Sequence, residues 1–201
     1  MAKVAYLCAA LAAASLTACA GLSANVHSVA DGAEAALQGE QTYTIARTQP
    51  QEDSADHPRA EQLLRDELAR HGFVETAGKP AHYVVSIAYS TRRASIGIGG
   101  AECAPADCGK GGDGLGALLF GNQYQHALTL RFFDSASGAQ RYKVNAVFVD
   151  RDADPLHALP LLMKTALAKL PFEAPGDWRV KLSVDKASGE PSVESMKPLQ
   201  R

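Results

Sequence analysis

The fold follows most directly from residues 124–148, which read YQHALTLRFFDSASGAQRYKVNAVF. Mostly apolar or aromatic side chains occupy every second position on both sides of the run Asp134–Gly138. Successive side chains of a strand point to opposite faces of a sheet, so this alternation predicts two strands that each turn one face to a core. The short connection contains a glycine and predicts that the strands pair as a hairpin.

Neighbouring segments add strands and helices to this hairpin. Alternating side chains predict a strand at about residues 82–91, another at Thr42–Arg47 and an edge strand at 178–184. Helical spacing of apolar residues predicts one helix over 58–71 and a second that begins near Pro155. The order strand, helix, three strands, helix predicts a two-layer α+β domain, with two helices on one face of an antiparallel sheet of about four strands.

The same patterns predict the core. The apolar faces of these strands and helices assign to it Leu64, Leu68, Ile87, Leu128, Leu130, Phe132, Phe148, Met163 and Leu167.

The N-terminus has the pattern of a lipoprotein signal peptide. Lys3 precedes an apolar run from Val4 to Leu16, which is shorter than the roughly 20 residues that span a bilayer. The run ends in Leu16-Thr17-Ala18-Cys19, which resembles the bacterial lipobox. This predicts cleavage before Cys19 and a lipid anchor, including palmitate, on its thiol. An ordinary secreted protein or a buried N-terminal helix is the alternative.

Composition restricts the class of protein. Removal of residues 1–18 from 201 leaves 183, which suits one domain, and loss of Lys3 changes the formal net charge from −2 to −3. No nucleic-acid partner is expected, because such binding needs a basic face. Ala20 and Gly21 follow Cys19 in place of an inner-membrane retention aspartate. The predicted location is therefore the periplasmic face of the outer membrane of a Gram-negative cell.

These assignments divide the chain into four parts. The expected parts are a signal peptide (1–18), a lipidated cysteine with a tether (19–40), the α+β domain (41–184) and a flexible tail (185–201). The tether has room for a short strand at Asn25–Val29. A glycine-rich insertion, 92–122, interrupts the domain.

Several of these motifs together resemble a known family. They are the lipobox, the strand at 42–46, the helix end LARHGF at 68–73, AHYVVSI at 81–87, the hairpin 130–147 and LAKLP at 167–171. The chain is similar over about 42–172 to the bacterial envelope lipoproteins grouped as the domain of unknown function numbered 4136. The resemblance implies an envelope lipoprotein and supplies no functional residues. The insertion and the extension beyond Pro171 depart from the family pattern.

The insertion holds the candidate site residues. Cys103 and Cys108 would lie in an oxidising compartment, which favours a disulfide. Free thiols and a metal site are the alternatives, although four intervening residues exclude a Cys-x-x-Cys redox motif. The apolar run Leu115, Leu118, Leu119 and Phe120 either packs on the domain or contacts a partner or the membrane. Its glycines lack the spacing of a phosphate-binding loop.

The histidines give little support for catalysis. His157 lies near Asp152 and Asp154, which hints at acid–base chemistry, yet the start of a helix explains both aspartates. His126 fits a satisfied histidine of the core or its rim. Because no hydrolase or metalloprotease motif occurs, we expect no enzyme, metal or cofactor. The expected role is that of a non-catalytic structural, assembly or partner-binding lipoprotein with an envelope protein partner; a carrier of lipid or another apolar ligand is the alternative.

Overall fold

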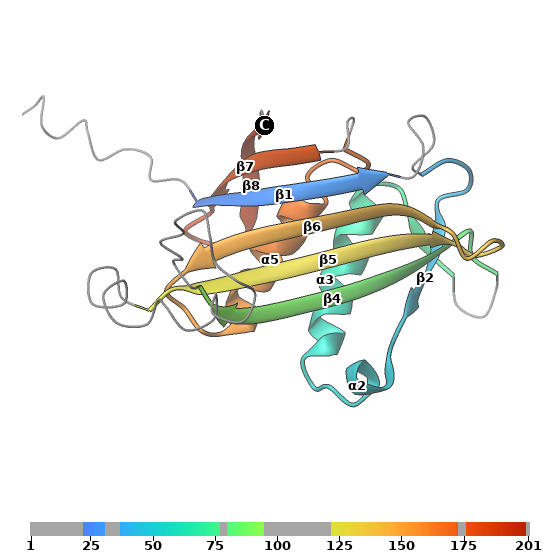
Figure 1. Ribbon diagram of the computed structural model, residues 1–201, viewed down its shortest axis with the longest axis horizontal. Coiled ribbons are helices and arrows are strands. Elements are labelled where there is room, and N and C mark those ends of the chain that lie inside the picture. The colour runs from blue at the N-terminus through green and yellow to red at the C-terminus, as the bar shows by residue number, and fades with distance from the viewer. Residues whose placement is uncertain (1–21, 31–36, 77–79, 95–121, 173–175, 200–201) are drawn as a thin grey trace, which may run out of the picture.

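One mixed sheet runs through the described part of the protein (Figure 1). The computed structural model describes residues 22–30, 37–76, 80–94, 122–172 and 176–199. The order across the sheet is β3-β2-β4-β5-β6-β1-β7-β8. In chain order the strands are β1 Leu22–Ala30, β2 Thr42–Ala46, β3 Val74–Glu75, β4 Tyr83–Arg93, β5 Tyr124–Asp134, β6 Gln140–Asp150, β7 Gly176–Val184 and β8 Pro191–Pro198.

Two longer helices lie together on one face of this sheet, behind it in Figure 1, and a short helix lies below the sheet in that view. They are the short α2, Gln49–Glu52, and the longer α3, His57–Arg70, and α5, Pro155–Ala166. Helix α3 ends as its sequence predicts: Gly72 adopts a φ of 82°, and the Phe73 amide donates to the Leu68 carbonyl at 3.0 Å. The Asp154 side chain caps α5 by accepting from the Leu156 amide, and Pro160 lies inside the helix without ending it.

The predicted sheet of about four antiparallel strands with two helices is wrong. The described residues form eight strands and three helices, and β2 runs parallel to both β3 and β4. The hairpin of β5 and β6 is confirmed, with Leu130 opposite Val144. The prediction did not include short strands such as Val74–Glu75, because two residues show no alternation and only their pairing defines the strand.

The two ends of the described chain account for most of the difference. Residues 22–30, placed mainly in a tether, form β1 between β6 and β7. Residues 191–198, placed in a flexible tail, pair with β7 as β8. Both segments are rich in small or polar side chains, so their hydrophobic pattern is weak. Their backbones nevertheless complete the hydrogen bonds of neighbouring strands, and this pairing depends on partners far away in the sequence.

The predicted core is confirmed. All nine residues assigned to it are buried, among them Leu64, Leu130 and Met163 with no exposed surface. The core lies between the helices and the inner face of the sheet, where β1 and β7 add Val26, Val180 and Leu182. Side chains therefore fill the space between the two layers.

The predicted insertion leaves the sheet at one point and returns to the same point. Strand β4 runs to Arg93, which pairs with Tyr124 at the start of β5. The Ala94 amide donates to the Gln123 carbonyl at 2.8 Å, so the two ends of the insertion meet. No helix in the described ranges combines the length and apolarity that a transmembrane span requires.

Candidate functional site

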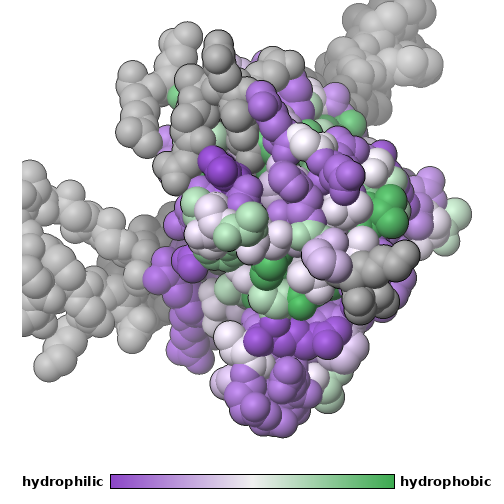
Figure 2. Space-filling view, turned by 90° about the vertical axis from the view of Figure 1, so that its right-hand side faces the viewer, coloured by the Kyte–Doolittle hydropathy of each residue, from purple (hydrophilic) through white to green (hydrophobic). Residues whose placement is uncertain are grey.

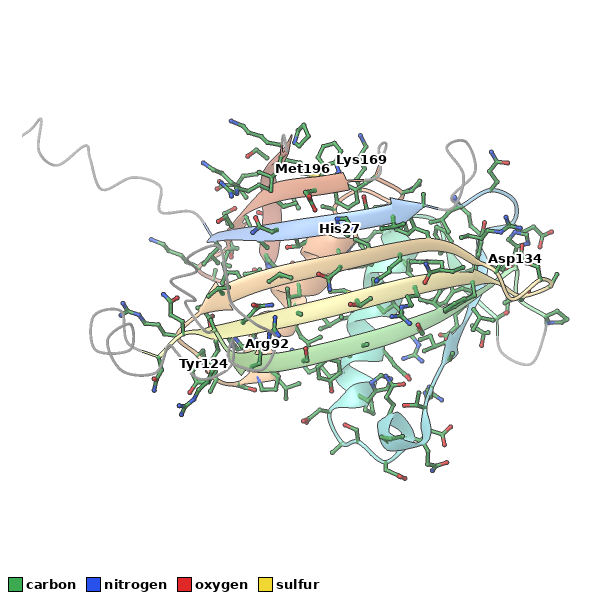
Figure 3. The ribbon with its side chains drawn as sticks, viewed as in Figure 1. His27, Arg92, Tyr124, Asp134, Lys169 and Met196 are labelled. Carbon is green, nitrogen blue, oxygen red and sulfur yellow. The ribbon has the colours of Figure 1, made fainter. Side chains whose placement is uncertain are left out.

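A cluster of polar side chains occupies one end of the sheet. Thr91 of β4, His126 of β5, Asp150 of β6 and His157 of α5 meet there. We call this the cluster end; there β4, β6 and β7 finish while β1 and β5 begin. Arg92 and Tyr124 mark it on the left of Figure 3, and Asp134 marks the opposite end.

His126 is the buried member of the cluster, with 1% of its surface exposed. Its Nε2 lies 3.1 Å from Asp150 Oδ1 and 3.0 Å from the Asp152 carbonyl oxygen. Both oxygens accept only, so Nε2 carries the ring proton in this arrangement, and Nδ1 accepts from the Thr91 hydroxyl at 2.8 Å. The prediction of a satisfied histidine is confirmed. The prediction did not include its contact with a second histidine.

His157 approaches the same carboxylate from the helix. Its Nε2 lies 2.6 Å from Asp150 Oδ2, and its Nδ1 lies 2.7 Å from the Asp154 carbonyl. Partial burial lowers the pKa of His157, but the hydrogen bonds to Asp154 and Asp150 outweigh it, and the net shift of the pKa is upward. Its ring meets that of His126 edge to face, with the ring centres 5.2 Å apart.

A hollow opens beside the cluster. It has a volume of about 410 Å³, and its lining includes Thr91, Tyr124, Ala153 and Pro155. Thr91 therefore links the hollow to buried His126. His126, Asp150 and His157 do not line the hollow themselves, and His157 keeps about a third of its side chain exposed.

The face of the sheet that is turned away from α3 and α5 is the second notable feature. We call it the outer face; His27 lies on it in Figure 3. No helix of the described ranges covers it. Over β4, β5, β6, β1 and β7 its carboxylate is Asp177, which is 2.7 Å from His27 Nδ1. Its cationic side chains, set by alternation and register, are Arg92, Arg131, Lys143, Arg179 and Lys181. Arg141 lies where the register of β5 and β6 shifts, and it pairs with Asp134 at 3.4 Å. The outer face is therefore basic although the chain is slightly acidic.

Apolar side chains are also exposed at the cluster end. Leu22 at the start of β1, Val149 near the end of β6 and Val184 at the end of β7 are 37%, 45% and 41% exposed. The opposite end, which faces the viewer in Figure 2, is mainly hydrophilic, with small separated hydrophobic areas. Val29 near the end of β1 and Val74 of β3 are also exposed and lie toward that opposite end, so both ends of the sheet carry exposed apolar side chains.

A larger groove lies on the helix side. It measures about 660 Å³ between α3, α5 and the turn that joins β7 to β8. Charged side chains from all three elements line it, including Arg59, Asp66, Lys164 and Glu190. Such a lining suits water and ions better than acyl chains.

The site residues predicted from the sequence lie outside the described residues. This holds for the lipidation site Cys19, the cysteines Cys103 and Cys108, and the apolar run Leu115, Leu118, Leu119 and Phe120. Their roles stay predictions. Local patterns did not indicate that His126, Asp150 and His157 form one cluster. The signals were His126 on the core-facing side of a strand and His157 near two aspartates, and only the pairing of β5 with β6 brings Asp150 to His126.

Comparisons with known proteins show limited similarity. No family model and no curated protein matches the chain, so the resemblance to the 4136 family stays a prediction. Among solved structures, a PDZ domain protein from Parabacteroides distasonis is similar at 12% identity and a TM-score of 0.45, over 81% of this chain. The chain spans 40% of that protein's length.

Two further solved structures resemble it. The PelC dodecamer from Paraburkholderia phytofirmans has 16% identity and a TM-score of 0.43, over 72% of this chain and 95% of that one. A candidate lipoprotein from Caulobacter crescentus has 13% identity and a TM-score of 0.26, over 63% of this chain and 75% of that one. At these scores none of the three bears on what this protein does.

Proposed function

We propose that the protein is a lipid-anchored lipoprotein of the bacterial envelope with a non-catalytic role, whose outer face rests on an anionic bilayer surface. The lipobox ending in Cys19 supports the anchor, and the residues after it favour the outer membrane, on its periplasmic side. The positive charge of the outer face supports the proposed contact with an anionic bilayer surface. An envelope protein that binds the exposed remainder of the domain is compatible with it.

The start of β1 keeps the domain close to its anchor. Leu22 follows Cys19 by three residues, and a fully extended chain covers at most about 3.6 Å per residue, or roughly 11 Å here. The expected long tether is thereby replaced by a short link. The exposed side chains of Leu22, Val149 and Val184 lie at this same end, where they can meet the apolar edge of the lipid headgroups.

The charges of the outer face match an anionic surface. Each Lys or Arg close to an anionic leaflet contributes about 1 kcal/mol of attraction. Lys181 lies opposite Ser23 and Arg179 lies opposite Asn25, so these two cations are among the residues nearest the anchor. Arg131 and Lys143, farther along the face, add to the same field.

The carrier alternative has less support. Leu64, Leu68, Leu159 and Met163 have no exposed surface, because they fill the space that an apolar ligand would need. The groove beside α3 and α5 is lined by charges. Mass spectrometry of the purified protein tests this alternative directly: a stoichiometric co-purified lipid would favour it over the surface-binding role.

Vesicle binding tests the outer face. We replace Cys19 by Ser so that the anchor does not mask weaker contacts, and measure sedimentation with vesicles of phosphatidylglycerol and phosphatidylcholine. The full chain should bind the anionic vesicles, and Arg179→Glu with Lys181→Glu should remove most of that binding. Arg59→Glu with Lys186→Glu, which makes the same change of charge on α3 and in the β7–β8 turn, is the matched control and should bind normally. Equal loss in both pairs would reject the outer face as the contact.

Palmitate labelling tests the anchor separately. The unsubstituted chain should incorporate labelled palmitate in a Gram-negative host and fractionate with membranes. Cys19→Ser should abolish the label and release the protein. Labelling that persists in this variant would reject Cys19 as the lipidated residue, whatever the vesicle experiment shows.

A further inference from the structure

We propose that His126, Asp150 and His157 form a binding site for a transition metal ion of the zinc class. Each residue offers one ligand atom, and the three atoms lie within 4.8 Å of one another. Two imidazole nitrogens and a carboxylate are a ligand set of zinc sites that keep a fourth position for water. Imidazole ligands favour Zn²⁺ and its neighbours over Ca²⁺ and Mg²⁺, which prefer oxygen.

The two rings already have the separation that one ion requires. In a tetrahedral site with Zn–N bonds of about 2.0–2.1 Å, two imidazole ring centres lie roughly 5 Å apart. The rings of His126 and His157 are 5.2 Å apart. Both present Nε2 to the Asp150 carboxylate, one to each oxygen, at 3.1 and 2.6 Å. An ion between these atoms would need only small side-chain rotations.

The surrounding contacts hold both rings in place. Histidine ligands of metals typically donate the other ring N–H to a carbonyl, carboxylate or hydroxyl oxygen, which fixes the ring and its tautomer. His157 Nδ1 has the Asp154 carbonyl at 2.7 Å, and His126 Nδ1 has the Thr91 hydroxyl at 2.8 Å. A hydroxyl can turn to accept as well as donate, so Thr91 fits the tautomer of His126 that leaves Nε2 for the ion.

Two further features concern access of water to the ion and the link that a bound ion would make between the sheet and α5. Thr91, which contacts His126, lines the 410 Å³ hollow, and about a third of the His157 side chain is exposed, so water has a route toward the fourth position. The ligands come from β5, β6 and α5, so a bound ion would tie the sheet to the start of the helix at the cluster end. Binding to the folded chain alone raises its stability in proportion to the logarithm of ligand concentration.

Calorimetric titration with Zn²⁺ alone tests the site. The purified full-length chain is alkylated at its free thiols, stripped with chelator and titrated, with its melting temperature measured in parallel. We expect one Zn²⁺ per chain, a dissociation constant in the micromolar range or tighter, a higher melting temperature with the metal, and no such binding of Ca²⁺.

Two variants separate the site from adventitious binding. His157→Gln removes a ligand with about a third of its side chain exposed, and it should weaken Zn²⁺ binding at least tenfold while circular dichroism stays unchanged. His27→Gln is the matched control, because His27 makes a 2.7 Å contact with Asp177 but has no second histidine beside it. It should bind as the unsubstituted chain does. Failure of the unsubstituted chain to bind Zn²⁺, or equal binding by His157→Gln, would overturn the proposal.

Discussion

Arg131 of β5 and Lys143 of β6 lie directly opposite each other on the outer face of the sheet. Like charges at paired positions of neighbouring strands are destabilising, so this pair works against the stability of the hairpin. The pair therefore costs stability and adds positive charge to the outer face.

This pair gives the first prediction. Arg131→Glu should raise the free energy of unfolding by about 0.2–1 kcal/mol, because it replaces a repulsive pair with an attractive one. The same variant should bind anionic vesicles less well. Lys181→Glu is the control: it lies opposite Ser23 and Ser195, so it should weaken vesicle binding without gaining stability. Urea denaturation measures the first effect, and a loss of stability in Arg131→Glu would contradict it.

The core gives the second prediction. Leu130→Ala should lower the free energy of unfolding by about 2–5 kcal/mol, because the side chain is fully buried between sheet and helices. Val149→Ala, at an exposed position of β6, should change it by less than about 0.5 kcal/mol. Similar changes in the free energy of unfolding for the two variants, measured by thermal or urea unfolding, would contradict the assignment of Leu130 to the core.

Glu61 gives a prediction for acidic pH. Its carboxylate, 3% exposed on α3, accepts hydrogen bonds from Nε and Nη2 of Arg47, the latter at 2.7 Å, and from Arg65 Nη2 at 3.0 Å. The bond to Arg47 lowers the pKa of Glu61 below its usual 4.5, more than burial raises it. The stability from this group is therefore present above pH 4.5 and is lost as the pH falls through the lower folded value.

Substitution isolates that contribution. Glu61→Gln should cost about 1–3 kcal/mol at pH 7, because it leaves the charged hydrogen bonds of two arginines unmade. The deficit relative to the unsubstituted chain should shrink in acid. Glu190→Gln, in the exposed β7–β8 turn, should change stability little at either pH. A deficit that stays constant from pH 7 down to pH 3 would show that the charge of Glu61 is not involved.

His57 gives a second pH prediction of separate origin. It is 2% exposed, it stacks on Tyr89 with ring centres 6.3 Å apart, and neither ring nitrogen has a hydrogen-bond partner. Burial lowers the pKa of His57 from 6.5, more than the attraction of Glu61 raises it. A buried neutral histidine favours folding above its unfolded pKa of 6.5, and that contribution disappears as the pH falls through the folded value.

Replacement by an aromatic ring without a proton site tests this. His57→Phe should keep the stacking on Tyr89 and remove the unpartnered nitrogens, so it should be neutral or stabilising at pH 7.5. Its advantage over the unsubstituted chain should grow as the pH falls below 6.5. Melting temperatures at both pH values measure this, and an advantage that shrinks in acid would mean that protonated His57 gains a partner, such as Glu61, whose Oε1 lies 3.5 Å from Nε2.

The insertion gives the last prediction. Deletion of residues 97–119 should leave the domain folded, because Arg93 pairs with Tyr124 and the predicted core lies outside the deleted segment. The melting temperature and circular dichroism of the shortened chain should stay close to those of the full chain. Binding to membranes or to an envelope partner should fall if the apolar run Leu115–Phe120 makes that contact. A deletion that unfolds the domain would contradict the first half, and one that keeps all binding would contradict the second.

Local patterns were sufficient for much of the fold. The alternation in 124–148 identified the hairpin and its core-facing residues, and helical spacing identified the helix predicted over 58–71, because these features depend on neighbouring residues only. The face of each predicted element was correct for all nine core positions. The histidine at 126 was recognised as buried and satisfied, although its partners were not.

Tertiary structure decided what local patterns leave open. The sequence by itself determined which residues form the central strands and helices and which side of each is buried, because the spacing of apolar residues indicates the buried side. It did not determine that Leu22–Ala30 inserts between β6 and β7 or that Pro191–Pro198 pairs as β8. The cluster of His126, Asp150 and His157 and the basic outer face both arise from register between distant strands. Pairing of the strand backbones sets that register. Because the backbone donors and acceptors are the same in almost every residue, the pattern of side chains does not reveal which distant strands pair.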